Sequence, residues 1–311
     1  MLQCTCYDCW GGIASCADTK DNGEIKSLGQ LPNIVRQASE LRQLVASWRA
    51  QRDTVSLVPT MGALHGGHMA LVAEAAKLGT RTVASIFVNP TQFAPSEDLD
   101  AYPTTWNDDI AKLRAVACDA VWAPTKSEMY ADGFSTKIVP GGPADGLETD
   151  HRAHFFGGVA TVCAKLFLQC LSDYALFGEK DYQQLLVVRQ IVSDLNIPVE
   201  IIAIPTVRDA DGLAMSSRNA YLSAEERARA PHLFQTIRQV ADDIKEGSSI
   251  DQARKVGRQS LSAAGFKVDY LDVRSAKDLT PMDDPLSNPA RILVAARLGT
   301  TRLIDNVALT P

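Results

Sequence analysis

The chain has 311 residues, 46% apolar and 22% charged, a mix typical of a packed globular protein and long enough for two domains. Its formal net charge of -6 disfavours a surface that coats nucleic acid, because phosphate binding needs an excess of Lys and Arg. No apolar run reaches the roughly 18 residues of a membrane span, and the first residues lack the regions of a secretory signal. We therefore expect a cytoplasmic protein with no nucleic-acid and no membrane partner.

Residues 1–30 are rich in Gly, Asp, Ser and Cys and show no hydrophobic period, so we expect a poorly ordered leader. Four of the seven cysteines lie in it: Cys4, Cys6, Cys9 and Cys16. A zinc site is the alternative reading, but the spacing lacks the second Cys pair or the His pair that such sites use. The other three cysteines lie in apolar stretches and are predicted to be buried.

Residues 31–204 alternate between helical and strand patterns, which predicts a Rossmann-like domain. Apolar runs predict strands over 55–58, 82–88, 120–123, 174–177 and 199–204, and helical periodicity predicts helices over 34–50, 68–78, 107–116, 159–171 and 182–195. Short apolar strands alternating with helices indicate a doubly wound parallel sheet covered on both faces.

Residues 205–311 follow a different pattern, which predicts a smaller C-terminal α+β domain that acts as a lid. Two helices are expected over 224–246 and 250–263, and strands over 267–273, 292–296 and 303–307. The overall fold class is therefore α/β, with a domain boundary near Ile204.

The loop after the first long strand reads Pro59-Thr-Met-Gly-Ala-Leu-His65-Gly-Gly-His68 and leads directly into a helix. Its glycines allow close approach to a ligand, and a helix start offers free N–H groups to phosphate. It is neither a Walker loop nor a dinucleotide fingerprint. A tight turn without function and a metal site on the two histidines are the alternatives, although no third metal ligand is near in sequence.

Three further polar loops follow buried strands, and ligands of doubly wound sheets bind at those strand ends. The amides of Asn89 and Gln92 suit a hydroxy acid or carboxylate. Lys180 can neutralise a phosphate, with Gln184 one helical turn away. The Met-Ser-Ser-Arg218 segment offers two hydroxyls and a guanidinium to an anion. Each loop alone could be a solvated turn, but their convergence is what an ATP site needs.

These motifs resemble a known family. The histidine loop and the Met-Ser-Ser-Arg segment are similar to the nucleotidyltransferase superfamily that includes class I aminoacyl-tRNA synthetases. Together with Phe-Val-Asn-Pro-Thr-Gln92-Phe and Phe-Gly-Glu-Lys180-Asp-Tyr-Gln-Gln184, they resemble the pantothenate synthetases (pantoate–β-alanine ligases) over about residues 34–307. The resemblance implies ATP-dependent joining of pantoate to β-alanine through a pantoyl-adenylate, with release of AMP and pyrophosphate, in a homodimer that needs Mg²⁺.

The resemblance also implies residue roles. His65, His68, Lys180 and Arg218 would be catalytic, with His68 at the position of the family's proton donor. Gln92, Gln184 and Asn89 would bind pantoate, and Gln92 would also meet β-alanine. Asp108 and Asp109 are candidate Mg²⁺ ligands, although acidic residues are common at helix starts anyway. The ATP site would comprise Met61, Gly62, Ala63, Leu64, His65, Gly66, Gly67, His68, Gly178, Glu179, Lys180, Asp181, Val207, Met215, Ser216, Ser217 and Arg218.

One segment departs from the family pattern Arg-Pro-x-His-Phe-x-Gly-Val. Here it reads Arg152-Ala-His154-Phe155-Phe-Gly-Gly-Val, so Phe155 stands at the usual His position and His154 one place earlier. The role of that histidine falls to His154 or is lost. Two other functions remain open from the sequence: another nucleotidyl transferase on the same fold, including a synthetase fragment acting on tRNA, and a nucleotide sensor without catalysis.

Overall fold

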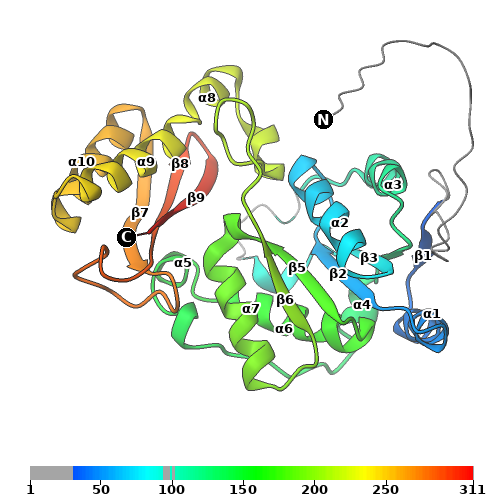
Figure 1. Ribbon diagram of the computed structural model, residues 1–311. Helices are drawn as coiled ribbons and strands as arrows, with labels where there is room; N and C mark the ends of the chain where they lie inside the picture. The colour runs from blue at the N-terminus through cyan, green and yellow to red at the C-terminus, as the bar shows by residue number, and fades with distance from the viewer. Residues whose placement is uncertain (1–30, 94–98, 100–101, 311) are drawn as a thin grey trace, which may run out of the picture.

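The computed structural model describes residues 31–93, 99 and 102–310. The expected leader, with its cysteines and the alternative zinc site, lies outside these residues. The described chain forms two sheets, each with its own helices (Figure 1).

The larger sheet is parallel throughout, with strand order β1-β4-β3-β2-β5-β6. Its strands are β1 (Asn33–Val35), β2 (Val55–Thr60), β3 (Arg81–Ile86), β4 (Ala120–Trp122), β5 (Tyr174–Gly178) and β6 (Glu200–Ile204). The direction of winding reverses between β2 and β5, which is where such sheets bind ligands. The predicted doubly wound sheet is thus confirmed.

Helices cover both faces of this sheet. On one face α1 (Ala38–Ala50), α6 (Phe155–Cys170) and α7 (Tyr182–Asp194) share a core with the strands, and on the other face α2 (Gly66–Leu78) and α3 (Trp106–Ala115) do so. Leu41 of α1 and Phe167 of α6 are almost fully buried, as is Leu113 of α3. Burial from two faces explains why apolar residues stand at consecutive positions in the strands rather than at every second one.

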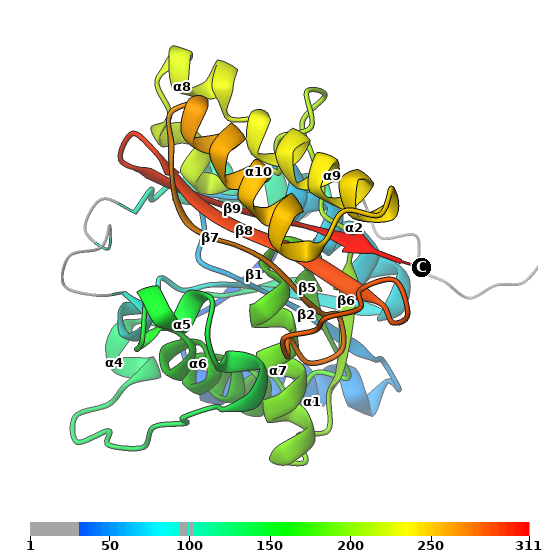
Figure 2. The same ribbon diagram turned by 90° about the vertical axis from the view of Figure 1, so that its left-hand side faces the viewer.

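The smaller sheet is antiparallel, in the order β7 (Phe266–Ser275), β8 (Ala290–Leu298) and β9 (Thr301–Leu309). Helices α9 (His232–Lys245) and α10 (Ile250–Ala263) cover one of its faces (Figure 2). On the opposite face Tyr270 and Leu293 pack with Leu147 and Leu186 of the first domain. The predicted α+β C-terminal unit is therefore confirmed, and its sheet is buried between its own helices and the Rossmann-like domain.

Several elements differ from their sequence predictions. Residues 33–35, which overlap the start of the predicted first helix, form β1 instead, because they pair with β4. The predicted helix over 224–246 is divided at Pro231, whose ring cannot continue a helix, into α8 (Ala224–Arg229) and α9. Short elements that the sequence did not predict are α4 (Lys126–Met129), α5 (Glu148–His151), η1 (Pro90–Gln92), η2 (Gly142–Ala144), η3 (Glu179–Asp181) and η4 (Ser217–Tyr221).

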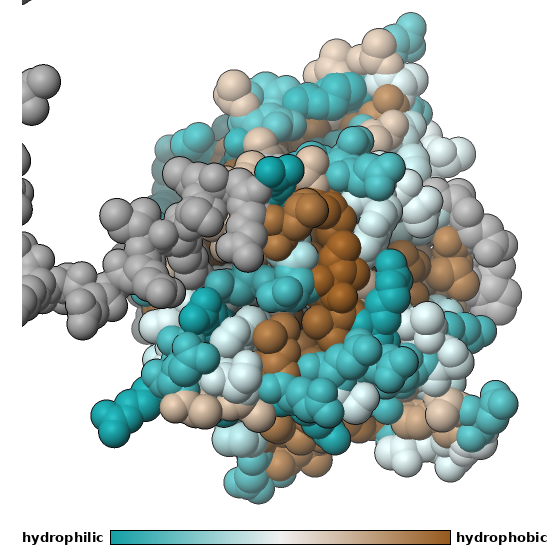
Figure 3. Space-filling view, turned by 90° about the vertical axis from the view of Figure 1, so that its right-hand side faces the viewer, coloured by the Kyte–Doolittle hydropathy of each residue, from teal (hydrophilic) through white to brown (hydrophobic). Residues whose placement is uncertain are grey.

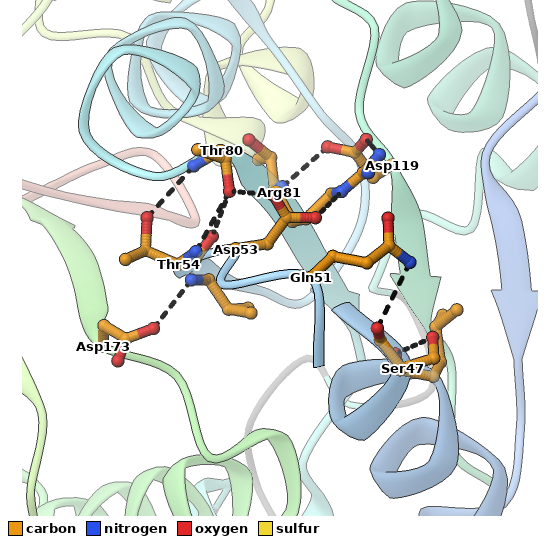
Figure 4. A network of polar contacts seen from close by, with 11 residues as sticks. Ser47, Gln51, Asp53, Thr54, Thr80, Arg81, Asp119 and Asp173 are labelled. Carbon is orange, nitrogen blue, oxygen red and sulfur yellow. Dashed lines mark hydrogen bonds and ion pairs between the residues drawn. The ribbon is translucent and has the colours of Figure 1, made fainter. Parts of the chain in front are cut away.

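A polar network fixes the amino-terminal ends of the central strands (Figure 4). Arg81, the first residue of β3, pairs with Asp53 at 2.7 Å and with Asp119 at 3.4 Å. The Asp119 carboxylate also accepts from the Thr82 backbone N–H at 2.7 Å, and Asp173 accepts from that of Val55 at 2.7 Å. These partnerships satisfy buried strand ends on the side of the sheet opposite to the loops that carry the predicted chemistry.

Candidate active site

The polar loops predicted from the sequence converge on one cavity of about 630 Å³ at the carboxyl ends of β2 and β5. The cavity lies at the point where the winding of the sheet reverses, and residues of the C-terminal domain close its other side. Each of its walls is built by a different segment of the chain.

The first wall is the loop from β2 into α2. Gly62 and Ala63 have positive φ angles of 83° and 49°, a conformation that glycine adopts freely and alanine only at a cost. The Gly62 N–H donates to Thr60 Oγ1 at 3.2 Å, and the N–H groups of Ala63 and Leu64 donate to Asp109 at 2.9 and 2.8 Å. These N–H groups are therefore occupied within the protein. The predicted phosphate donors are thus the imidazoles and the helix start rather than the N–H groups of residues 62–64.

The rings of His65 and His68 are in contact, with centroids 4.1 Å apart and a 39° tilt between their planes. Nδ1 of His65 accepts from the Gly67 N–H at 3.1 Å, and Nδ1 of His68 accepts from the His65 N–H at 3.3 Å. A nitrogen that accepts carries no proton in neutral imidazole, so both rings hold their proton on Nε2. Both line the cavity, and Nε2 is the nitrogen left to donate to a ligand.

Burial and nearby cations keep this pair neutral. Desolvation, then the charge of Lys180, lowers the pKa of His65 from 6.5 to about 4. Desolvation, then His65 and Lys180, lowers the pKa of His68 from 6.5 to about 3. Near neutral pH both histidines are thus uncharged hydrogen-bond donors, which suits stabilisation of negative charge on phosphate oxygens.

The second wall is the loop after β3, which carries Asn89 and Gln92. Asn89 Nδ2 donates to Gln92 Oε1 at 3.1 Å and to the carbonyl oxygen of Gly158 at 3.2 Å. The loop lies so close to α6 that a Cβ at Gly158 would stand 2.5 Å from the Thr91 carbonyl oxygen. Asn89 and Gln92 are almost fully buried and line the cavity, and Asn89 holds the Gln92 amide in place.

The third wall is the loop after β5, where Lys180 and Asp181 line the cavity and Gln184 follows on α7. The C-terminal domain holds this loop through its backbone. Asn306 Nδ2 of β9 donates to the carbonyl oxygens of Glu179 and Lys180 at 2.8 and 2.9 Å. Packing of the two domains therefore fixes where Lys180 stands.

The fourth wall is the segment from Val207 to Arg218. Ser217 Oγ donates to the Ala63 carbonyl oxygen at 3.0 Å, so this segment rests directly on the first loop. Arg208 anchors its start by two bonds to Asp305, at 2.6 and 2.9 Å, and by stacking on Phe234. Burial of Asp305 raises the pKa of its carboxyl, and the Arg208 guanidinium opposes that effect.

Most predicted site residues line this one cavity: Met61, His65, Gly67, His68, Asn89, Gln92, Gly178, Lys180, Asp181, Gln184, Val207, Met215, Ser216, Ser217 and Arg218. The predicted residues outside its lining are Gly62, Ala63, Leu64, Gly66, Glu179, Asp108 and Asp109. Glu179 instead pairs with Arg291 of β8 at 3.0 Å. Asp108 is exposed on α3, whereas Asp109 is buried with both oxygens bonded to the first loop.

Phe155, which stands where the family pattern has a histidine, faces the cavity. The guanidinium of Arg152 lies over its ring, 3.9 Å from the centroid. His154 is exposed and outside the cavity lining. The position at the cavity is thus apolar, with a cation stacked on it.

Sequence reasoning missed the cavity residues contributed by the C-terminal sheet and their partner on α5. Arg302 of β9 bonds Glu148 of α5 at 2.7 Å, and the Tyr270 hydroxyl donates to the same carboxylate at 3.0 Å. All three line the cavity, as do Asp305 and Asn306. Tyr270, Arg302, Asp305 and Asn306 belong to ordinary strand patterns in the sequence, and only the packing of the β7-β8-β9 sheet against the first domain brings them to Glu148 and the cavity.

Within the described part of the chain, no group of three or more His, Cys, Asp or Glu residues could hold a metal ion. In the same residues, none of the helices combines the length and the apolar character that crossing a membrane requires.

Known proteins share this sequence and architecture. The family model described as pantoate-beta-alanine ligase matches residues 33–308. A pantothenate synthetase of Bradyrhizobium sp. strain BTAi1 is 54% identical over 283 residues, covering 91% of this chain and 100% of the relative. One from Caulobacter vibrioides is 53% identical over 281 residues, covering 89% of this chain and 99% of the relative.

Solved structures agree with this result. A pantothenate synthetase from Thermus thermophilus has a TM-score of 0.84 at 43% identity and covers 90% of this chain and 100% of its own. A pantoate-beta-alanine ligase from Francisella tularensis, solved in complex with beta-gamma ATP and beta-alanine, has a TM-score of 0.75 at 31% identity and covers 89% and 97%. The chain is an enzyme that belongs to the pantoate–β-alanine ligase family.

Proposed function

We propose that this chain condenses pantoate with β-alanine in two steps at the single cavity. In the first step a pantoate carboxylate oxygen attacks the α-phosphorus of ATP, the bond to the bridging oxygen breaks, and pyrophosphate leaves. In the second step the β-alanine amine attacks the carbonyl carbon of the adenylate, loses its proton, and AMP leaves. The observation that carries the proposal is the convergence of His65, His68, Lys180 and Arg218 on the cavity that also holds Gln92 and Gln184.

Positioning and charge neutralisation provide the catalysis in the first step, because phosphoryl chemistry offers the protein little covalent work. The two Nε2–H groups and the Lys180 ammonium donate to the oxygens on which negative charge develops. Ser216 and Arg218 bind the same polyphosphate from the fourth wall, where the Ser217 hydroxyl donates a hydrogen bond to the Ala63 carbonyl oxygen. His68 acts here as a neutral hydrogen-bond donor, since this step consumes no proton.

The amides bind pantoate. Gln92 and Gln184 line the same cavity from different elements, and amide groups match a hydroxy acid that both donates and accepts. Gln92 also meets β-alanine, while Asn89 orients its side chain through the 3.1 Å bond between their amides. Phe155 adds an apolar surface, and no hydrogen-bond donor, to the cavity in which pantoate binds.

Magnesium accompanies ATP and neutralises phosphate charge when bound. The absence of a cluster of metal-ligating side chains among the described residues fits an ion held mainly by phosphate oxygens and water. Neither Asp108, which is exposed, nor Asp109, whose oxygens are both occupied, is assigned to it.

The domain of residues 205–311 acts as a lid over residues 31–204. Two contacts between the domains support this role. Ser217 bonds the first loop, and Asn306 bonds the loop that carries Lys180. A closed lid keeps water from the adenylate, which would otherwise hydrolyse.

The enzyme works as a homodimer in the cytoplasm. Apolar residues gather in the middle of the face drawn in Figure 3. Leu31, two residues before β1, and Ile34 of β1 are also exposed, which gives a second copy apolar surface to cover. Cys118, Cys163 and Cys170 are free thiols, as in a reducing compartment. Light scattering of the purified protein tests the dimer.

Product analysis with each substrate omitted in turn tests the function. The proposal predicts pantothenate, AMP and pyrophosphate in equal amounts, and only with ATP, pantoate and β-alanine all present. Formation of ADP, or activity when pantoate is replaced by another acid or an amino acid, would assign the chain to a different transferase. ATP binding without AMP formation would make it a nucleotide sensor.

A further inference from the structure

Asp109 is a buried carboxylate whose hydrogen bonds go to the loop between β2 and α2. It lies on α3 with 1% of its surface exposed, and both of its oxygens face the loop that carries the histidine pair. Oδ2 accepts from the Ala63 N–H at 2.9 Å, and Oδ1 accepts from the Leu64 N–H at 2.8 Å. Thr105 Oγ1 donates to Oδ1 at 3.1 Å.

The two bonded N–H groups lie in or next to a turn with positive φ angles, a conformation that costs energy for residues other than glycine. Gly62 and Ala63 follow each other at positive φ, and successive N–H groups in such a turn form a concavity that binds an anion. In many proteins that anion is a phosphate of the ligand. Here the Asp109 carboxylate fills the concavity, so the loop is held by an internal anion.

A second contact from α3 completes the hold. Lys112 Nζ donates to the Leu64 carbonyl oxygen at 2.6 Å, so one helix bonds both the N–H and the C=O of Leu64. The next residue is His65, whose own N–H fixes the tautomer of His68. The orientation of both imidazoles therefore depends on the backbone that Asp109 and Lys112 fix.

We propose that Asp109 is a positioning residue for ATP: its carboxylate bonds the N–H groups of Ala63 and Leu64 and so holds the positive-φ turn at Gly62 and Ala63 that aims His65 and His68 at the phosphates. The proposal rests on the proposed function of the cavity. It assigns Asp109 no contact with substrate or metal, and it makes α3 part of the catalytic apparatus.

Asp109→Asn tests the proposal, because the amide keeps the size of the side chain but has only one acceptor oxygen. Its NH₂ group faces one of the two backbone N–H donors, so that hydrogen bond is lost. We expect kcat/KM for ATP to fall by about 10- to 100-fold, the usual result of misplacing reactive groups, while KM for pantoate changes less than about twofold. Hydrogen exchange at Ala63 and Leu64 should accelerate in the same variant. Unchanged kcat/KM for ATP, or a KM for pantoate that rises by as large a factor as kcat/KM for ATP falls, would overturn the proposal.

A double-mutant cycle with Ala63→Gly shows whether the effect passes through the loop. Glycine adopts positive φ without the cost that alanine carries, so it should restore part of the activity lost in Asp109→Asn. Strictly additive effects of the two substitutions would contradict the proposal. If Asp109→Asn does not fold, Lys112→Met releases the other contact and should shift the same parameters in the same direction; no shift would count against the proposal.

Asp108→Asn and a magnesium titration separate positioning from metal binding. Asp108 carries the same charge one residue away and is exposed. A positioning role predicts a wild-type magnesium dependence in both aspartate variants. Loss of activity in Asp108→Asn, or rescue of Asp109→Asn by excess Mg²⁺, would overturn it. If wild-type protein makes no AMP, the proposed function fails, whereas the exchange rates at Ala63 and Leu64 still report whether Asp109 holds the loop.

Discussion

The backbone N–H of His65 donates to Nδ1 of His68 over 3.3 Å, so the first histidine sets the tautomer of the second. Because Gly67 sets the tautomer of His65 in the same way, both rings present Nε2–H to the cavity. In the proposed function, the two neutral donors bind phosphate and the ammonium of Lys180 supplies positive charge beside them.

The neutral pair predicts a particular pH dependence of activity. The pKa values of about 4 and 3 for His65 and His68 lie well below 6.5, so neither ring gains a proton between neutral pH and about pH 5. We expect kcat/KM for ATP to show no fall with an apparent pKa near 6.5. Such a fall, if it disappeared in a His68→Asn variant, would mean that His68 gains a proton near pH 6.5 and that this protonation lowers the activity.

The same shifts predict how stability changes with pH. A depressed pKa in the folded state means that, below pH 6.5, the unfolded chain takes up protons that the folded chain refuses. The contribution of His65 and His68 to stability is therefore complete above pH 6.5 and is lost as pH falls towards their folded-state pKa values. The melting temperature of the wild type should fall more steeply over this range than that of His68→Asn. Parallel curves would contradict the depressed pKa.

Removal of one phosphate donor should abolish most of the turnover. His68→Ala or Lys180→Ala should leave the fold intact and lower kcat by at least about 100-fold, the usual scale for one preorganised donor. Lys77→Ala is the matched control for charge, because Lys77 is exposed on α2, where it pairs with Glu74. Turnover close to that of the wild type in either site variant would remove that residue from the mechanism.

Gly158 is predicted to affect pantoate binding indirectly, because it packs against the backbone of the loop that carries Gln92. A Cβ at this position would stand 2.5 Å from Thr91 O and 2.7 Å from Gln92 N, so Gly158→Ala must displace the loop that carries Gln92. We expect KM for pantoate to rise by about tenfold or more, because a misplaced binding group loses most of its effect. Gly157→Ala is the control: its Cβ would meet Ile138 O at an ordinary 3.5 Å. Equal behaviour of the two variants would contradict this account.

The buried pair between Arg208 and Asp305 should be expensive to break. Asp305 is 3% exposed, and Asp305→Ala leaves the guanidinium without its partner, so the free energy of unfolding should fall by about 3–5 kcal/mol in urea titrations. Glu74→Ala removes an exposed ion pair and should cost less than about 1 kcal/mol. A small effect of Asp305→Ala would show that the segment starting at Arg208 is held on β9 without this pair.

The sequence predicts the parts of the site that belong to strand ends, and it does so for a physical reason. Parallel strands bring their carboxyl ends to one edge, so the loops with His65, Gln92 and Lys180 had to meet once the strands were identified. The fold class followed from the same alternation of apolar strands and helices.

Contacts that depend on tertiary structure could not be predicted in this way. Asn306 reaches the Lys180 loop only because β9 packs against it, and no local pattern distinguishes it from any other strand residue. Asp109 reads as a favourable acid at a helix start, and its partners Ala63 and Leu64 lie more than forty residues earlier. Pro231 is different: the prediction of one helix over 224–246 was wrong, although a proline inside a helical pattern is a local signal of the observed break.

Exchange of labelled pyrophosphate into ATP tests the central claim most directly, because it detects the adenylate before any amine is used. The account predicts exchange that requires pantoate, proceeds without β-alanine, and is lost in Lys180→Ala. Exchange that requires β-alanine, or none at all in an enzyme that still makes pantothenate, would contradict a pantoyl-adenylate formed where these four loops meet.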